Sequence, residues 1–164
     1  MIDTLMKQLV FINGDRYYLW LAIDSEIRFI LAFHLTKSRS EDSAFTLINV
    51  VKKLGEPSNF ITDRLPSYNQ AVAKVLPNTK HITVAPMSSD TNNNLIESFN
   101  KTFKAWYKSP KGFNSFEKAN NLIYLLIFHY NFIRPHRSLN NHTPVKVASF
   151  ASDSKSKNSW FVAA

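Results

Sequence analysis

The chain opens with three short stretches of β-forming residues and continues into a helix with strong signals at both ends. The β-forming stretches cover residues 2–8, 16–23 and 28–35, and turn signals separate them at Gly14-Asp15 and Ser25-Glu26. Strands joined by short turns pair with their neighbours in opposite directions. The opening of the chain therefore predicts an antiparallel meander of three strands.

The helix after these strands has a start signal and a stop signal. Ser40 can cap its first turn, and Gly55 followed by Pro57 ends it. Acidic residues occupy the first turn and lysines the last turn, an arrangement that the helix dipole favours. The predicted buried stripe consists of Ala44, Leu47, Ile48, Val51 and Leu54. We therefore expect a helix over residues 41–54.

Shorter elements alternate along the next part of the chain. A strand ends at Asp63, a helix covers about residues 66–76, and a brief strand covers residues 80–84. The order βββαβαβ predicts an α/β fold with a mixed five-stranded sheet flanked by helices. Two further helices are expected, one that carries Glu97 and one that covers residues 114–134, with Asn114 as its cap. The predicted apolar face of the helix that carries Glu97 consists of Ile96, Phe99, Phe103 and Trp106.

The charge and composition of the chain narrow the classes of partner. Twenty Lys and Arg residues against twelve Asp and Glu give a formal charge of +8, and 13% of the residues are aromatic. A sequence pI near 9.7 favours nucleic acid over a membrane surface. The absence of cysteine excludes a disulfide framework, a thiolate zinc site and a cysteine nucleophile.

The longest apolar run, Leu122 to Phe128, is far shorter than the roughly 20 residues of a membrane span. We therefore expect no membrane partner and a cytoplasmic, nucleoid-associated protein. The run is apolar on all sides of its helix, which indicates either a core helix or a subunit interface. A homo-oligomer is accordingly expected.

Two acidic residues occupy settings that suit a divalent-metal site. Asp63 follows the apolar run Phe60-Ile61-Thr62 and enters a turn, as a residue at the end of a strand does. Glu97 lies in a segment of helical periodicity, with Lys101 and Lys104 on the same face. Carboxylate oxygens are the ligands that Mg²⁺ prefers. Carboxylates next to lysines therefore predict a site for a metal ion and a phosphate group.

Several segments of the sequence resemble motifs in the catalytic core of DDE transposases, most closely those of the insertion-sequence-six family. They are Thr62 to Tyr68, Asn93 to Tyr107, and Tyr130 to Leu139 followed by Thr143-Pro144. The resemblance implies the RNase H-like fold of retroviral integrases. It covers about residues 3–148, so we expect one catalytic core over residues 1–148. Residues 149–164 are rich in Ser and Lys without periodicity, which predicts a disordered tail.

The resemblance implies a two-metal centre that cleaves DNA ends and joins them to a target. Three carboxylates would hold two Mg²⁺ or Mn²⁺ ions, with Asp63 between the ions and Glu97 on the second. Lys104 would face the DNA backbone near the cleaved phosphate, and Lys101 is the less favoured lysine. Other cations expected to contact DNA are Arg64, Arg134 and Arg137.

The third carboxylate departs from the family pattern. In the family, the first aspartate belongs to an Asp-Glu-Thr segment that precedes a glycine and the second strand. The equivalent here is Asp3-Thr4 with Gly14, a spacing about three residues longer than the pattern, and the glutamate is missing. Asp24 is an alternative at the end of the second strand. We expect Asp3 to complete the catalytic set.

Family members carry a DNA-binding segment, usually helix-turn-helix, ahead of this core. We therefore expect an N-terminally truncated transposase, which the resemblance makes a magnesium-dependent polynucleotidyl transferase by family. The alternative function is a non-catalytic remnant that binds DNA or co-assembles with a full-length transposase.

Overall fold

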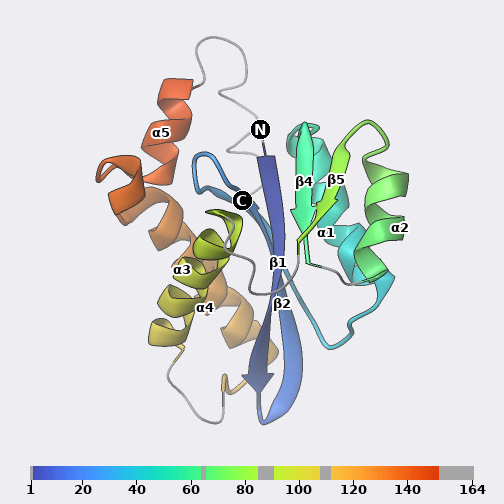
Figure 1. The fold of residues 1–164 in the computed structure, drawn as a ribbon. Coiled ribbons are helices and arrows are strands. Elements are labelled where there is room, and N and C mark those ends of the chain that lie inside the picture. Colours follow the sequence, from blue (N-terminus) through green and yellow to red (C-terminus); the bar gives the residue numbers. More distant parts are fainter. Residues whose placement is uncertain (1, 64–65, 85–90, 108–111, 152–164) are drawn as a thin grey trace.

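The structure is a computed structural model that describes residues 2–63, 66–84, 91–107 and 112–151. Five strands form one mixed sheet in the order β3-β2-β1-β4-β5 (Figure 1). The strands are β1 (Ile2–Ile12), β2 (Asp15–Asp24), β3 (Ile30–Thr36), β4 (Asn59–Thr62) and β5 (Lys80–Thr83). The predicted order βββαβαβ and the α/β class are confirmed.

The first three strands form the predicted antiparallel meander. β1 pairs with β2 from Asp3 opposite Asp24 to Ile12 opposite Asp15, and β2 pairs antiparallel with β3. Asn13 and Gly14 connect β1 to β2 with positive φ angles of 51° and 83°, the conformation that tight hairpins require. β1 also pairs in parallel with β4, and β4 with β5. β1 is therefore a central strand with a neighbour on each side.

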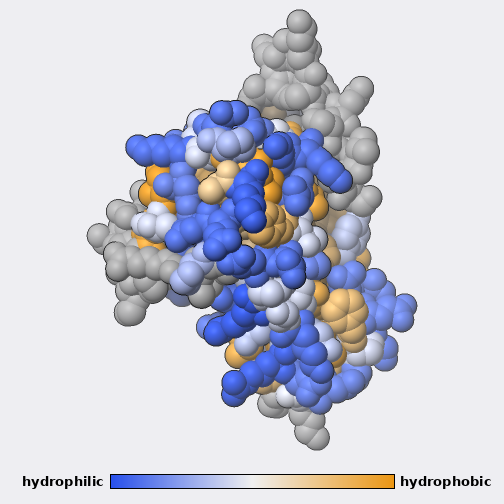
Figure 2. Space-filling model, turned by 90° about the vertical axis from the view of Figure 1, so that its right-hand side faces the viewer, coloured by the Kyte–Doolittle hydropathy of each residue, from blue (hydrophilic) through white to orange (hydrophobic). Residues whose placement is uncertain are grey.

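Two pairs of helices cover the two faces of the sheet (Figure 1). Helices α1 (Glu41–Leu54) and α2 (Pro66–Val75) cover one face, and α3 (Thr91–Trp106) and α4 (Phe116–Phe128) cover the other. Ser40 precedes α1 and Gly55 follows it, as predicted, but the Ser40 side chain makes no capping hydrogen bond within the described residues. The side of the molecule that bears α2 and β5 is covered mostly by hydrophilic residues, with hydrophobic residues between them (Figure 2).

The strands supply alternate residues to the two hydrophobic clusters. On β2, Trp20 belongs to the cluster under α1 and α2, whereas Leu19 and Leu21 belong to the cluster under α3 and α4. On α3 the buried residues include Phe99 and Phe103, as predicted. The prediction for Trp106 is wrong, because 48% of this residue is exposed.

The end of the chain differs in detail from the prediction. Ser115 rather than Asn114 caps α4, since the Ser115 hydroxyl accepts a hydrogen bond of 3.2 Å from the backbone N–H of Lys118. A π-helical turn (His129–Ile133) and a 3₁₀ turn (Arg137–Leu139) lead to a short helix, α5 (Pro144–Ala151). Residues 149–151 thus belong to a helix, and the rest of the predicted tail lies outside the described residues. No helix within the described ranges is long and apolar enough to cross a membrane.

Gly112 is expected to tolerate no side chain. A Cβ atom there would lie 1.9 Å from the backbone oxygen of Phe11, and the residue has a φ of +78°. We expect Gly112→Ala to lower the free energy of unfolding by about 2 kcal/mol. Gly14→Ala is the control, because its φ is +83° but no atom of the described part of the chain lies within 4 Å of its Cβ position. Urea unfolding of both variants checks the prediction, and equal losses would contradict it.

Candidate functional site

Asp63 lies directly after β4, at the carboxyl end of the parallel part of the sheet. Thr62, the last residue of β4, is buried, and its hydroxyl lies 2.8 Å from Nε2 of His81 on β5. The same hydroxyl donates a hydrogen bond of 3.0 Å to the backbone oxygen of Asp63. Asp63 itself is partly exposed. The sheet therefore presents this carboxylate at the strand edge where α/β proteins bind ligands.

The charge of Asp63 shifts the pKa values of two side chains, Lys7 and Tyr68. Burial lowers the pKa of Lys7, and the nearby carboxylate of Asp63 acts in the opposite direction. The Lys7 ammonium lies 5.4 Å from the centre of the Trp20 ring. Burial, together with the charge of Asp63, raises the pKa of the Tyr68 hydroxyl. A lysine of the same chain thus compensates part of the charge of Asp63.

Asp3 lies at the start of β1 in a different environment. The residue is 0% exposed, and among the described residues neither carboxyl oxygen has a hydrogen-bond partner. Burial and the charge of Asp24 raise the pKa of Asp3 to about 7. Asp24, opposite Asp3 on β2, accepts hydrogen bonds from the backbone N–H groups of Glu26 (2.9 Å) and Ile27 (3.2 Å). Burial raises the pKa of Asp24 as well.

The structure does not bring Asp3 to Asp63. Asp3 is level with Phe60 on β4, three residues before Asp63. Three strand residues span about 10 Å, whereas paired catalytic metal ions lie only about 3.5–4 Å apart. Within the described ranges, no group of three His, Cys, Asp or Glu residues could hold a metal ion. Asp3 and Asp63 therefore do not fit a shared pair of magnesium ions.

The remaining predicted site residues lie on α3 or beyond it. Glu97 belongs to α3 between the buried residues Leu95 and Phe99, and its side chain lies outside the described part of the chain. Lys101 and Lys104 are exposed on the same helix, which leaves both lysines open to a ligand. Arg64 lies outside the described residues.

Three arginines from distant segments line one polar cavity of about 440 Å³, which we call the arginine pocket: Arg28, Arg134 and Arg137. Ser98, next to Glu97 in the sequence, also lines it. The guanidinium group of Arg134 donates a hydrogen bond of 2.6 Å to the hydroxyl of Thr102 on α3. A cluster of guanidinium groups with a hydroxyl is a site for a phosphate group.

Sequence reasoning identified Arg134 and Arg137 but missed Arg28. Arg28 lies in the turn between β2 and β3 and has a left-handed φ of 59°, which is uncommon for a long side chain. Arg28 meets Arg134 and Arg137 because the segment after α4 packs against the β2–β3 region, where Asn131 of the π-helical turn bonds to the backbone of Ile30. No local signal in the sequence shows this contact.

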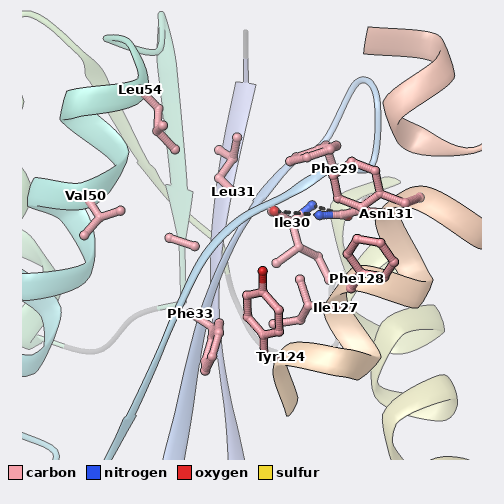
Figure 3. A pocket seen from close by; sticks show the side chains of 12 residues that line it. Phe29, Ile30, Leu31, Phe33, Val50, Leu54, Tyr124, Ile127, Phe128 and Asn131 are labelled. Atoms are coloured by element: carbon pink, nitrogen blue, oxygen red, sulfur yellow. Dashed lines mark hydrogen bonds between the residues drawn. The ribbon is translucent and has the colours of Figure 1, made fainter. Parts of the chain in front are cut away.

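A second cavity, of about 350 Å³, is apolar and lies along the edge strand β3 between α1 and α4 (Figure 3). Aromatic and aliphatic side chains line most of it, among them Phe33, Leu54 and Phe128. The side chain of Asn131 lies at its border and makes two hydrogen bonds of 2.9 Å with the backbone N–H and C=O of Ile30 (Figure 3). This cavity has the chemistry of a packing surface.

Comparisons with known proteins agree with the fold. The catalytic core domain of BIV integrase superposes with a TM-score of 0.67 at 13% identity, covering 92% of this chain and 94% of that chain. The HTLV-2 integrase catalytic core in complex with magnesium, in its trimeric form, gives a TM-score of 0.65 at 14% identity, covering 89% and 94%. The protein is therefore an α/β domain with the RNase H-like fold of retroviral integrase cores.

The family follows from the sequence comparisons. Residues 5–132 match the DDE domain of IS240-type transposases. A transposase of the insertion sequence-like element IS431mec from Staphylococcus aureus is 37% identical over 94 residues, covering 57% of this chain and 42% of that protein. The chain belongs to the DDE domain family of transposases, which confirms the resemblance found in its motifs. The family match begins after Asp3.

Proposed function

We propose that the chain acts on transposon DNA as the RNase H-like domain of an insertion-sequence-six transposase, in the cytoplasm and on the nucleoid. The DDE domain match over residues 5–132 carries this proposal. The formal charge of +8 and the arginine pocket support it, because both suit a phosphate backbone. The aligned segment spans less than half of the Staphylococcus aureus relative, at 42% of its length.

The catalytic form of this proposal is metal-dependent cleavage of DNA ends followed by strand transfer. DDE transposases generally depend on a divalent metal. Asp3, Asp63 and Glu97 would be the carboxylates for two Mg²⁺ or Mn²⁺ ions, as the resemblance implies. The place of Asp63 at the end of β4 supports this set, whereas the place of Asp3 in the register does not.

A second candidate function is non-catalytic. In this form, the chain binds DNA or co-assembles with a full-length transposase and does not cut DNA itself. One observation favours it: β1 does not bring Asp3 to Asp63.

The proposal predicts that the chain binds a fluorescent DNA duplex in EDTA and that added salt weakens the binding steeply. Fluorescence anisotropy measures both effects. Absence of binding at low salt would contradict the proposal that the chain binds DNA.

Incubation with supercoiled plasmid and Mn²⁺ then separates the catalytic from the non-catalytic candidate function. Nicking that Asp63→Asn abolishes establishes the catalytic form, and binding without nicking establishes the non-catalytic form.

We also propose that the chain self-associates through α4. Five large hydrophobic residues of this helix are exposed, among them Leu122 (39%), Leu125 (54%) and Phe128 (44%). Related solved structures are described as dimeric and trimeric forms of an integrase core. An exposed apolar helix face is a frequent protein contact surface.

Leu125→Asp is expected to shift the chain from oligomer to monomer, since it places a charge in the centre of the apolar face of α4. Size-exclusion chromatography with light scattering gives the mass. Leu9→Asp is the matched control, because Leu9 is also an exposed leucine (39%) but lies on β1. A monomeric wild-type chain, or equal effects of the two substitutions, would contradict the proposal.

A further inference from the structure

The position that the family's metal chemistry needs on β1 is occupied by an apolar side chain. We infer that Met6 stands where the first metal-binding carboxylate would have to be, so that this chain does not hold a pair of divalent ions by itself. The inference rests on the proposed function and decides between its two forms in favour of the non-catalytic one.

The strand register gives the position. β1 and β4 pair in parallel with Asp3 level with Phe60 and Thr4 level with Ile61. When this register continues for two residues, Met6 stands level with Asp63. Neighbouring strands are about 4.8 Å apart, which is close enough for two side chains to share an ion. Met6 is thus the residue of β1 that lies beside Asp63.

The alternation of side chains along β1 gives the same answer. Met6 belongs to the buried cluster that includes Leu95 and Phe99, the α3 residues on either side of Glu97 in the sequence. Leu5 belongs to the opposite cluster. Asp3 is two residues from Leu5 and therefore shares its face. A carboxylate at position 6 would face α3, whereas Asp3 faces the other side of the sheet.

The sequence spacing agrees with the structure. Asp3 lies about three residues too far from Gly14 for the family pattern, and a shift of three residues towards Gly14 leads to Met6. The family match also begins at residue 5, so it includes Met6 and excludes Asp3. The β1–β4 register, the face of β1 that a residue occupies and the spacing to Gly14 thus all indicate Met6.

The side chains of Met6 and the next residue, Lys7, do not suit the binding of a hard divalent cation. A methionine thioether is a soft ligand, and Mg²⁺ and Mn²⁺ select oxygen ligands. Met6 is only 4% exposed, so an apolar side chain is buried at this position. Lys7 is close enough for the charge of Asp63 to raise its pKa, against the effect of burial. A cation of the chain itself therefore stands near the carboxylate that the metal ions would need.

The first test uses the unaltered chain with Mn²⁺ as the probe. We expect Mn²⁺ titration followed by electron paramagnetic resonance, and thermal unfolding with and without Mn²⁺, to give the same result for wild type, Asp63→Asn and Asp3→Asn. Strong Mn²⁺ binding by the wild type that either substitution abolishes would overturn the inference. This test does not depend on the folding of any variant at position 6.

The second test restores the carboxylate. The Tm of Met6→Asp is expected to be roughly 5 °C or more higher with Mn²⁺ than without it, because an ion that binds the folded state stabilises it. Met6→Asn is the matched control, since it adds polarity without charge, and it should show no such rise. A folded Met6→Asp protein that gains nothing in Mn²⁺, or an equal rise for Met6→Asn, would contradict the inference.

DNA binding separates this inference from the proposed function. Anisotropy with a DNA duplex in EDTA tests the proposed function without any metal. Binding in EDTA together with an unaltered Mn²⁺ response in Asp63→Asn supports both. Loss of DNA binding with the same Mn²⁺ results contradicts the proposed function alone.

Discussion

Asp3→Asn should make the chain more stable than the wild type at pH 8, by up to about 4 kcal/mol. The Asp3 carboxyl has a pKa of about 7 in the folded chain against 3.8 as its ordinary value. Each pKa unit corresponds to about 1.36 kcal/mol. A raised carboxyl pKa means that the folded state binds the proton more tightly than the unfolded state, so this group costs stability as the pH rises from 3.8 to about 7. Asparagine removes that cost.

Urea unfolding at pH 4.5 and pH 8 measures this effect. The wild type should lose stability over this range, and Asp3→Asn should lose much less. Asp15→Asn is the control, because Asp15 is exposed and pairs with Lys37 at 2.7 Å on the surface. A variant less stable than the wild type at pH 8 would contradict the prediction.

Replacing Arg28, Arg134 and Arg137 together with Gln should weaken DNA binding by roughly 100- to 500-fold at 0.1 M salt. All three line the arginine pocket, and each phosphate contact releases counterions from the DNA. The slope of log K against log salt should become less steep by up to about 2.7, since each contact contributes about 0.9. The loss should be the same for unrelated DNA sequences, because phosphate contacts carry no base information.

A triple variant of equal charge change is the control for the arginine pocket. Lys52, Lys53 and Lys80 are exposed and lie on α1 and β5, outside the pocket. Their replacement by Gln should change affinity much less. Equal effects of the two triple variants would show that overall charge, rather than the pocket, binds DNA. Circular dichroism must show intact folding, because Arg134 also bonds to Thr102.

Local signals predicted most of the fold. Turn residues divided the meander, and Ser40 and Gly55 marked the limits of α1, because these choices depend on backbone conformation within a few residues. Asp63 was recognised as the end of a strand from the apolar run before it. Trp106 was misplaced because helical periodicity says which face is apolar but not how far the core extends.

Contacts between distant segments could not be predicted in the same way. The register of β1 against β4 joins segments that β2, β3 and α1 separate in the sequence, so no local signal predicts it. This register places Met6 rather than Asp3 level with Asp63. The arginine pocket likewise requires the β2–β3 turn to meet the segment after α4. The spacing between Asp3 and Gly14 is about three residues longer than the family pattern. Only the pairing of β1 with β4 shows that Met6 therefore takes the position of the family's aspartate.

The chain thus has the scaffold of a DDE transposase domain with one position of its metal chemistry altered. Asp63 keeps its place at the end of β4, and α3 carries Glu97. β1, which pairs with β4 and contacts α3, has methionine where a carboxylate is needed. We therefore expect DNA binding to be separable from cleavage, because no β1 residue lines the arginine pocket.

Anomalous diffraction from crystals grown with Mn²⁺ tests this account most directly. Data collected at the manganese absorption edge should show no manganese between Asp63 and Glu97 in the wild type, and should show it there in Met6→Asp. Two manganese peaks in the wild type, bound by Asp63 and Glu97 together with Asp3, would contradict the account.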